Sequence, residues 1–355
     1  MSSTMRAFVI KEVGRTEVME KPVPEPGPEE AVVRTTAALI CTSDVHTVKG
    51  ALPVPADRTL GHESVGVIHK LGSAVTGFTE GQRVAVCAVT PCYRCTACQR
   101  GFTSQCGGAL GGYKYTIQMD GNMAEYFVVP AAAANLTPIP DDVSDEQAVY
   151  TCDMLTTGFM GVEHAYLRFG ETIAVFAQGP VGLCATMGAH LMGAGRIFAV
   201  ESRPERQALA KRFGATDIVD FTAGDPVEQI MDLTGGEGVD GAVEAFGFPQ
   251  TFEACLRVTK PGGRVSNVGY HGENPNPLQL PLDAFGLGMN DKSIHTGLCP
   301  GGNERMQRLL RLLESGRIDP TPMTTHTFGF DRIADAFALM TSKEDGIIKP
   351  LITFG

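Results

Sequence analysis

The chain has 355 residues, which at roughly 150 residues per domain suggests two domains. Apolar residues make up 43% and charged residues 19% of the chain, a balance that argues against wholesale disorder. The 29 Lys and Arg against 40 Asp and Glu give a net charge of −11, which disfavours binding to nucleic acid or to an anionic membrane surface.

Residues 1 to about 150 are predicted to be rich in β-strand. Short β-branched runs lie at 31–36, 64–68 and 82–86, and turns that contain Pro and Gly, such as 24–28, separate them. No helical periodicity of useful length occurs before about residue 142. We therefore expect a β-rich domain in this part of the chain.

From about residue 170, short apolar runs alternate with helix-like segments. The runs lie at 172–177, 196–200, 216–219, 239–245 and 264–268, and the helices are expected to begin near 181, 204, 225 and 251. Such alternation predicts a parallel sheet covered by helices on both faces, and short continuous apolar runs suit strands buried on both sides. The predicted fold class is α/β, with a doubly wound parallel sheet beside the β-rich domain.

The C-terminal segment is predicted to hold two helices and an end strand. Ile333, Ala336, Phe337 and Met340 follow the i, i+3, i+4, i+7 spacing of one apolar helix face. A glycine at 346 ends this helix, and the apolar residues between 347 and 352 are expected to form a closing strand.

The sequence carries no signal for export or for membrane insertion. Its first residues lack the charged-then-apolar layout of a signal peptide, and no stretch approaches the ~18 uninterrupted apolar residues of a membrane helix. We therefore expect a soluble, cytoplasmic protein. In a reducing compartment, its 10 cysteines are more naturally used for metal binding or catalysis than for disulfides.

Four cysteines form a local cluster with the pattern C-x2-C-x2-C-x7-C, namely Cys92, Cys95, Cys98 and Cys106. Four thiolates at this spacing can close a tetrahedron around Zn²⁺ at roughly 2.3 Å per bond, and a site filled by protein has a structural role. A ferredoxin-type iron–sulfur run begins the same way, but its fourth cysteine normally follows after three residues and precedes a proline. Here Gly107 follows a longer gap, so we favour structural zinc over an iron–sulfur cluster or four unrelated thiols.

Three further fragments, at 40–46, 61–63 and 151–158, carry side chains that can bind a metal. Taken singly, a cysteine or histidine is more often packed in a core than bound to an ion. Together the fragments offer a thiolate, an imidazole and a carboxylate, a set that would hold a catalytic Zn²⁺ with one coordination position open.

The first βα turn of the alternating region reads Ala177-Gln-Gly179-Pro-Val-Gly182. A G-x-G-x-x-G motif at such a turn lets the backbone approach a pyrophosphate at a helix N-terminus. Here alanine replaces the first glycine, a change that is tolerated if its φ stays negative. An ordinary structural turn remains open as an alternative, but Glu201 at the end of the next predicted strand favours a dinucleotide site.

These fragments together resemble the zinc-dependent medium-chain alcohol dehydrogenases, and within that family the bacterial tetrameric secondary alcohol dehydrogenases. The likeness covers essentially the whole chain and rests most specifically on the segments 41–46, 61–63, 153–158 and Leu298-Cys-Pro-Gly-Gly302. It implies a Rossmann domain at 155–297, a GroES-like catalytic domain at 1–154 and 298–355 with a zinc lobe at 92–106, and a homotetramer. The four-cysteine lobe departs from the secondary alcohol group, whose members often lack it, and this leaves the substrate less certain.

The resemblance implies that Cys41, His62 and Asp153 bind the catalytic zinc. Cys152 is a rival for the third place, but counting back five residues from Gly158 reaches Asp153.

The same resemblance assigns four further residues around this metal. Glu63 is expected beside the ion, able to enter its shell, and Asp44 is expected to orient the ring of His62. Ser43 matches the group that takes the alcohol proton, and His46 the outer relay to solvent. Zinc then acts as a Lewis acid that makes the alkoxide accessible near neutral pH, while hydride passes to or from the nicotinamide.

The segment Glu201-Ser202-Arg203 bears on the choice between NAD and NADP. A carboxylate at Glu201 can bind the ribose hydroxyls and would repel a 2′-phosphate. Related NADP enzymes have Gly-Ser-Arg here, with the arginine on the phosphate, and a tyrosine where this chain has Phe221. We predict NAD, with NADP as the alternative.

The leading functional hypothesis is an NAD(P)-dependent zinc alcohol dehydrogenase or carbonyl reductase that acts on secondary alcohols and ketones. Thr157 and Val181 match residues that line the nicotinamide, and Tyr113 and Leu298 match pocket positions that favour an apolar substrate. A polyol dehydrogenase of the same family, a non-catalytic zinc- and dinucleotide-binding protein and a zinc-free quinone reductase remain alternatives.

Overall fold

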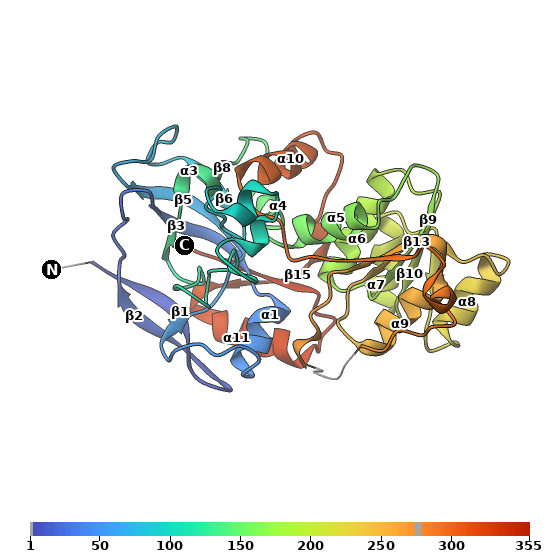
Figure 1. Cartoon of the computed structure of the whole chain (residues 1–355). Coiled ribbons are helices and arrows are strands. Elements are labelled where there is room, and N and C mark those ends of the chain that lie inside the picture. Colours follow the sequence, from blue (N-terminus) through green and yellow to red (C-terminus); the bar gives the residue numbers. More distant parts are fainter. Residues whose placement is uncertain (1–2, 274–277) are drawn as a thin grey trace. The chain divides into compact units, whose positions relative to one another are not determined.

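The computed structural model describes residues 3–273 and 278–355 and divides the chain into two compact units (Figure 1). The first unit runs up to Thr156 and resumes with Cys299–Gly355, and the second unit is Thr157–Leu298. The chain thus leaves the first unit at 156/157 and returns to it at 298/299, where the sequence had suggested 154/155 and 297/298.

Two sheets form the first unit within the described residues. The larger, seven-stranded sheet has the order β15-β16-β3-β5-β6-β8, with β7 also paired to β3. Its strands are β3 (Ala31–Leu39), β5 (Ser64–Leu71), β6 (Arg83–Val86), β7 (Tyr126–Val129), β8 (Leu136–Pro138), β15 (Thr324–Gly329) and β16 (Lys349–Thr353). The smaller sheet consists of β2 (Arg15–Pro22), β1 (Thr4–Glu12) and β4 (Arg58–Thr59). The three runs predicted near 31, 64 and 82 are therefore strands of one sheet.

Short helices connect these strands, and the sequence did not predict the first three of them, which all lie before residue 142. They are α1 (Thr42–Val48), α2 (Thr96–Gln99), α3 (Ala132–Asn135) and α4 (Asp145–Val149). The helix α1 was missed because two turns are too short to give a clear 3.6-residue period. It is defined instead by its start, where the side chain of Asp44 accepts a hydrogen bond from the backbone N–H of Cys41 at 3.0 Å.

The apolar stripe predicted near the C-terminus forms the buried face of α11 (Ile333–Ser342). Ile333, Ala336, Phe337 and Met340 are all buried in one core cluster with residues of β1, β3 and β16. The two remaining helices of the first unit are α10 (Asn303–Glu314) and, shared with the second unit, α5 (Met154–His164).

The second unit is built on a six-stranded parallel sheet with the order β11-β10-β9-β12-β13-β14. Its strands are β9 (Thr172–Phe176), β10 (Arg196–Val200), β11 (Asp217–Val219), β12 (Val239–Glu244), β13 (Thr259–Asn267) and β14 (Ser293–Thr296). The crossover helices are α6 (Pro180–Leu191), α7 (Pro204–Arg212), α8 (Pro226–Leu233) and α9 (Pro249–Val258). Numbered within the unit, this order is 3-2-1-4-5-6, the arrangement of a Rossmann sheet. The predicted α/β class is confirmed; only β14 among these strands was not predicted.

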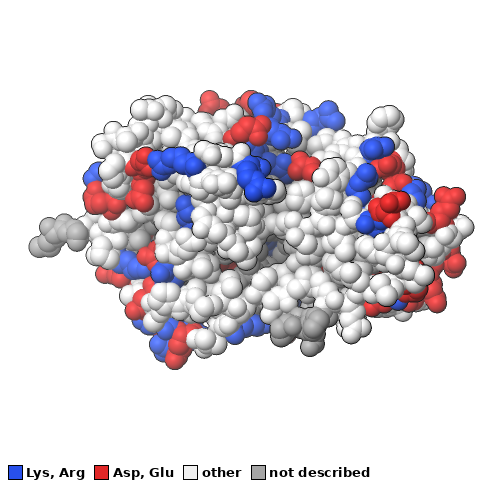
Figure 2. Space-filling view, in the orientation of Figure 1, with Lys and Arg blue, Asp and Glu red and all other residues white. Residues whose placement is uncertain are grey.

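Charged side chains of both signs are interspersed over the face of the molecule drawn in Figure 2. This pattern gives no single-sign stripe on that face of the kind that a nucleic acid would require. Within the described residues, no helix combines the length and the apolar character needed to cross a membrane.

Candidate functional site

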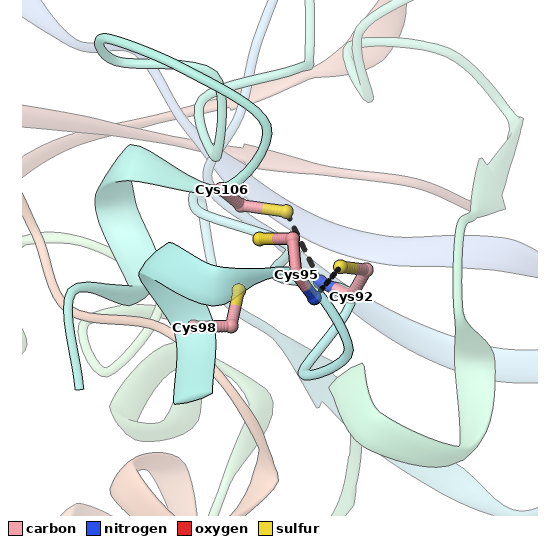
Figure 3. Close-up of side chains that lie close together, drawn as sticks. All are labelled: Cys92, Cys95, Cys98 and Cys106. Atoms are coloured by element: carbon pink, nitrogen blue, oxygen red, sulfur yellow. Dashed lines mark hydrogen bonds between the residues drawn. The ribbon is translucent and has the colours of Figure 1, made fainter. Parts of the chain in front are cut away.

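The four cysteines of the predicted zinc lobe lie together in space (Figure 3). Their sulfur atoms are all within 4.8 Å of one another. Backbone N–H groups point at them: Arg94 N and Cys95 N each lie 3.4 Å from Cys92 Sγ, and Cys92 N lies 3.3 Å from Cys106 Sγ. Such N–H groups stabilise thiolate charge, so the loop is shaped to hold ionised sulfur.

The thiols of this lobe differ in how easily they ionise. A backbone hydrogen bond from Cys98 is the main reason that the pKa of Cys95 falls to about 6. Burial is the main reason that the pKa of Cys98 rises to about 12. A divalent cation at the centre would favour the ionised form of all four thiols. The donor set fits the structural zinc that the sequence predicts.

A second group of metal-binding side chains, assembled from distant parts of the chain, consists of Cys41, His62, Glu63 and Asp153, whose ligand atoms lie within 4.8 Å of one another. His62 Nε2 is 3.6 Å from Asp153 Oδ2 and 3.8 Å from Glu63 Oε1, and Cys41 Sγ is 3.9 Å from Asp153 Oδ2. Ligands held tetrahedrally at zinc bond lengths are about 3.3–3.8 Å apart. The spacing therefore suits one ion at the centre of the group.

Asp44 links the segments that carry two of these side chains. Besides its bond to Cys41 N, its carboxylate accepts a hydrogen bond from Gly61 N at 3.2 Å and lies 3.3 Å from His62 Nδ1. Asp44 and His62 are each 1% exposed, so water does not compete for these contacts. One carboxylate thus fixes both the start of α1 and the ring of His62, as a carboxylate–histidine–metal arrangement requires.

Tyr113 and Ser43 also reach the ring of His62. The Tyr113 hydroxyl lies 3.0 Å from His62 Nδ1, and Ser43 Oγ lies 3.3 Å from His62 Nε2. Burial alone would lower the pKa of His62, but Tyr113 and Asp44 outweigh it and leave the pKa well above its ordinary value. Asp44 and Asp153, which help to raise this pKa, would equally stabilise a metal cation bound to the neutral ring of His62.

Glu63 forms a buried ion pair that the sequence analysis missed. Lys349 Nζ lies 2.8 Å from Glu63 Oε1 and donates a second hydrogen bond to Ile40 O at 3.1 Å, and both charged side chains are 0% exposed. Glu63 Oε2 is buried with no hydrogen-bond partner among the described residues. The sequence did contain a sign of this pair, because Lys349 is the one charged residue in the predicted strand at 347–352 and a buried lysine needs an acidic partner.

The turn at 177–182 between β9 and α6, which the sequence predicts to bind a phosphate and which we call the phosphate turn, differs from its prediction in one respect. Ala177 has φ +71°, not the negative value that we expected for an alanine in place of glycine. A Cβ at Gly182 would lie 1.9 Å from Ala177 O, so the Ala177 carbonyl can pack against the start of α6 only because residue 182 is glycine. Gly179 is the N-cap of α6, and a Cβ there would meet nothing within 4 Å, which leaves the helix N-terminus open to a phosphate.

Glu201 lies at the end of β10, where the sequence placed it, and is 5% exposed. Its carboxylate accepts hydrogen bonds from the backbone N–H groups of Gln178, Ser202 and Arg203 at 3.2, 2.9 and 3.1 Å. Arg206 lies 3.6 Å from the same carboxylate. Glu201 therefore links the phosphate turn to the start of α7. The backbone N–H groups and Arg206 partly balance the negative charge of its carboxylate.

The remaining predicted residues lie as follows. His46 is on α1, three residues after Ser43, and is half-buried. Thr157 is on α5 and Val181 is on α6, while Leu298 immediately precedes the return to the first unit. Phe221 is 50% exposed.

Comparison with known proteins identifies the class. The family description "Alcohol dehydrogenase GroES-like domain" matches residues 27–141, and "Zinc-binding dehydrogenase" matches residues 180–315. The chain is 46% identical to an alcohol dehydrogenase of Cupriavidus necator, with 98% of each chain covered. It is 45% identical to an NADP-dependent isopropanol dehydrogenase of Thermoanaerobacter brockii, with 98% of this chain and 99% of the relative covered. The solved alcohol dehydrogenase TADH of Thermus sp. ATN1 is 31% identical, with a TM-score of 0.90 and 99% and 100% of the two chains covered.

This chain therefore belongs to the zinc-dependent medium-chain alcohol dehydrogenases. The predicted family, the Rossmann and GroES-like architecture and the enzyme class, a zinc alcohol dehydrogenase, are confirmed. The predicted preference for NAD is not supported by the names of these relatives.

Proposed function

We propose that the enzyme interconverts secondary alcohols and ketones with a nicotinamide as the hydride carrier. The observation that carries the proposal is the convergence of Cys41, His62 and Asp153 on one point. The isopropanol dehydrogenase of Thermoanaerobacter brockii, a secondary alcohol enzyme by its name, supports the choice of substrate class. The alternative polyol or non-catalytic proteins have no specific observation in their favour.

The catalytic zinc would be held by Cys41, His62 and Asp153, with Glu63 as an exchangeable fourth ligand. Such a metal supplies Lewis acidity, which lowers the pKa of a bound alcohol. Ser43 takes the alcohol proton, and its hydroxyl is already within 3.3 Å of His62 Nε2. His46, one turn further along α1, passes the proton to solvent. Asp44 keeps His62 in the orientation that this chemistry needs.

The nicotinamide cofactor belongs on the second unit. The open N-terminus of α6 at Gly179 and the close packing at Gly182 suit the pyrophosphate. Thr157 and Val181 are proposed to line the nicotinamide, and Ser202 and Arg203 to flank the adenosine ribose beside Glu201. We propose NAD because the 2′-phosphate of NADP would be repelled by the Glu201 carboxylate. NADP is the alternative, because Arg203 and Arg206 lie nearby and relatives of this chain are named as NADP-dependent.

Two zinc ions per chain, a homotetramer and a cytoplasmic location complete the proposal. The second zinc would belong to the lobe of Cys92, Cys95, Cys98 and Cys106. Assembly is supported by exposed apolar side chains in the segment that precedes the edge strand β14 in sequence, namely Leu278, Leu280, Leu282, Leu287 and Met289. None of the ten cysteines, all of which the structure describes, is in a disulfide, which suits a reducing compartment.

The test is metal analysis combined with turnover. We expect about two zinc ions per chain and activity on secondary alcohols that exceeds activity on polyols. Replacement of the proposed ligand in Cys41→Ser should lower the zinc content by one ion and abolish turnover, with the circular dichroism spectrum unchanged. Cys255→Ser, which removes a buried thiol far along the chain from both clusters, is the control. Full activity of Cys41→Ser would refute the assignment.

A further inference from the structure

The two ring nitrogen atoms of His62 have different surroundings. Nε2 lies 3.6 Å from Asp153 Oδ2 and 3.8 Å from Glu63 Oε1, so this nitrogen faces the other proposed metal ligands. Nδ1 lies 3.3 Å from Asp44 Oδ1 and 3.0 Å from the Tyr113 hydroxyl. A neutral imidazole that gives its Nε2 lone pair to a metal carries its hydrogen on Nδ1, so the contacts of Nδ1 decide how the ring is held.

Asp44 shares its carboxylate among several donors. Its Oδ1, the atom that lies 3.3 Å from His62 Nδ1, also accepts a hydrogen bond from Gly61 N at 3.2 Å, and its Oδ2 accepts one from Cys41 N at 3.0 Å. A separation of 3.3 Å is just beyond the usual range for an N–H···O hydrogen bond, which is about 2.7–3.2 Å. The Tyr113 oxygen, at 3.0 Å, is therefore the closer of the two acceptors for the Nδ1 hydrogen.

The four-cysteine lobe at 92–106 holds the backbone that carries Tyr113. The neighbouring Gly112 donates a hydrogen bond from its N–H to Ser104 O at 3.0 Å. A Cβ at Gly112 would lie 2.6 Å from Thr103 O, so this close approach to the lobe needs a glycine. The ring of Tyr113 then meets the ring of His62 edge to face, with 5.2 Å between the centroids. The hydroxyl is thus presented to His62 by a backbone that is itself fixed.

We propose that Tyr113 is a positioning residue for the catalytic zinc, because its hydroxyl accepts the hydrogen bond from His62 Nδ1 and, together with Asp44, fixes the ring. The resemblance to known enzymes gave Tyr113 only a place in the substrate pocket. The inference rests on the proposed function, in which His62 binds the zinc. It makes the metal affinity of the site depend on this hydroxyl, and partners that orient a ligating histidine contribute about 10–100-fold in affinity.

The first test is the release of zinc from Tyr113→Phe, which removes the hydroxyl and keeps the ring. Zinc-loaded protein is titrated with EDTA, and the concentration that removes half of the catalytic zinc should be about tenfold lower than in the parent. The matched control is Tyr115→Phe, since the Tyr115 hydroxyl donates to a backbone carbonyl, Val128 O at 3.2 Å, and not to His62. This control should release zinc as the parent does.

A second background separates the two zinc ions. Cys41→Ser lacks a proposed ligand of the catalytic zinc and keeps all four cysteines of the lobe, so the ion that remains in it belongs to the lobe. Addition of Tyr113→Phe to Cys41→Ser should leave the release of this ion unchanged. Easier loss of the lobe ion would show a general loosening of the structure and would overturn the inference, and so would release of the catalytic zinc from Tyr113→Phe at the parent concentration.

A third measurement reads the arrangement of the ligands without turnover. Cobalt(II) in place of zinc absorbs visible light, and the bands that are missing from Cys41→Ser belong to the catalytic site. These bands depend on ligand geometry, so they should change in Tyr113→Phe and match the parent in Tyr115→Phe. Unchanged bands in Tyr113→Phe would contradict a positioning role. Absence of all turnover in the parent protein would refute the proposed function, and the release and absorption data would still decide the role of Tyr113.

Discussion

Lys349 and Glu63 form an ion pair that is closed off from water beside the candidate catalytic metal. A buried carboxylate without a cation is costly, and two cations are available to this one: the ammonium at 2.8 Å and the metal proposed at the centre of the cluster. The residue that neutralises the Glu63 carboxylate is thus a lysine 286 positions away in sequence. Its role is visible only once the fold is known.

Breaking this pair should destabilise the protein strongly. For Lys349→Met in protein freed of metal by a chelator, we expect a loss of about 3–5 kcal/mol in the free energy of unfolding at neutral pH, since Glu63 is then left as an unpaired buried charge. Burial already raises the pKa of Glu63, so its protonated form is favoured in the folded state and the defect should grow as pH rises through this raised pKa. Urea denaturation at pH 5 and pH 8 measures the difference.

Two further variants serve as controls for this experiment. Lys70→Met breaks an exposed pair with Glu25 and should cost less than about 1 kcal/mol. Addition of Glu63→Gln to Lys349→Met should recover part of the lost stability. An equal, small effect of both lysine substitutions would contradict the buried-pair argument.

The choice of cofactor depends on Glu201. We expect Glu201→Ala to raise the ratio of kcat/KM with NADPH to that with NADH by at least about tenfold, because a carboxylate no longer opposes the 2′-phosphate while Arg203 and Arg206 remain. Steady-state kinetics with both cofactors checks this. The control is Glu205→Ala, which removes an exposed acidic residue from the first turn of α7 and should leave the ratio unchanged. An unchanged ratio in Glu201→Ala would place the ribose contact elsewhere.

At the scale of elements, the β9–α6 turn stores backbone strain. Ala177 adopts φ +71°, where glycine is favoured over alanine by roughly 1 kcal/mol or more. We therefore expect Ala177→Gly to raise the free energy of unfolding or leave it unchanged, although a substitution by glycine usually lowers it. Ala208→Gly, in the exposed interior of α7, should instead cost about 1 kcal/mol. Thermal unfolding of both variants gives the comparison, and an equal loss in both would show that the turn is not strained.

The four-cysteine lobe should release protons when it takes up zinc. The pKa of Cys95 is lowered to about 6, so this thiol is ionised at pH 7.5, whereas burial raises the pKa of both Cys98 and Cys106 above the ordinary value of a thiol, and both are protonated at this pH. Zinc binding must deprotonate the latter two, and Cys92 as far as it is still protonated, so we expect release of about two to three protons per ion at this pH. Calorimetric zinc titration of metal-depleted Cys41→Ser, in buffers of different ionisation enthalpy, isolates the lobe. Release of no protons would contradict the assigned ionisation states.

At the scale of the whole molecule, the sequence predicted the two-part architecture, and its family resemblance predicted the catalytic ligands and the contact of Asp44 with His62, but neither predicted the pairing of Lys349 with Glu63. Strand–helix alternation and cysteine spacing are local patterns, so they could be interpreted without coordinates. The helix α1 was too short for its period to be detected, and the positive φ of Ala177 belongs to a turn that packs against Gly182. The pairing of Lys349 with Glu63 depends on β16 lying beside β3, a contact between the two ends of the chain that no local pattern encodes.

The neighbours of β3 have a consequence for synthesis on the ribosome. β3 pairs along one side with β5, which follows soon after it; on the other side its residues 31–34 pair with β7, and only residues 37–39 pair with β16, which ends at Thr353. At roughly 5–20 residues per second, the C-terminal end of β3 waits on the order of 15–60 s for β16, while the contiguous second unit emerges and can fold. An edge left open for so long is a target for wrong pairing, so the nascent chain should depend on chaperones more than the finished enzyme does.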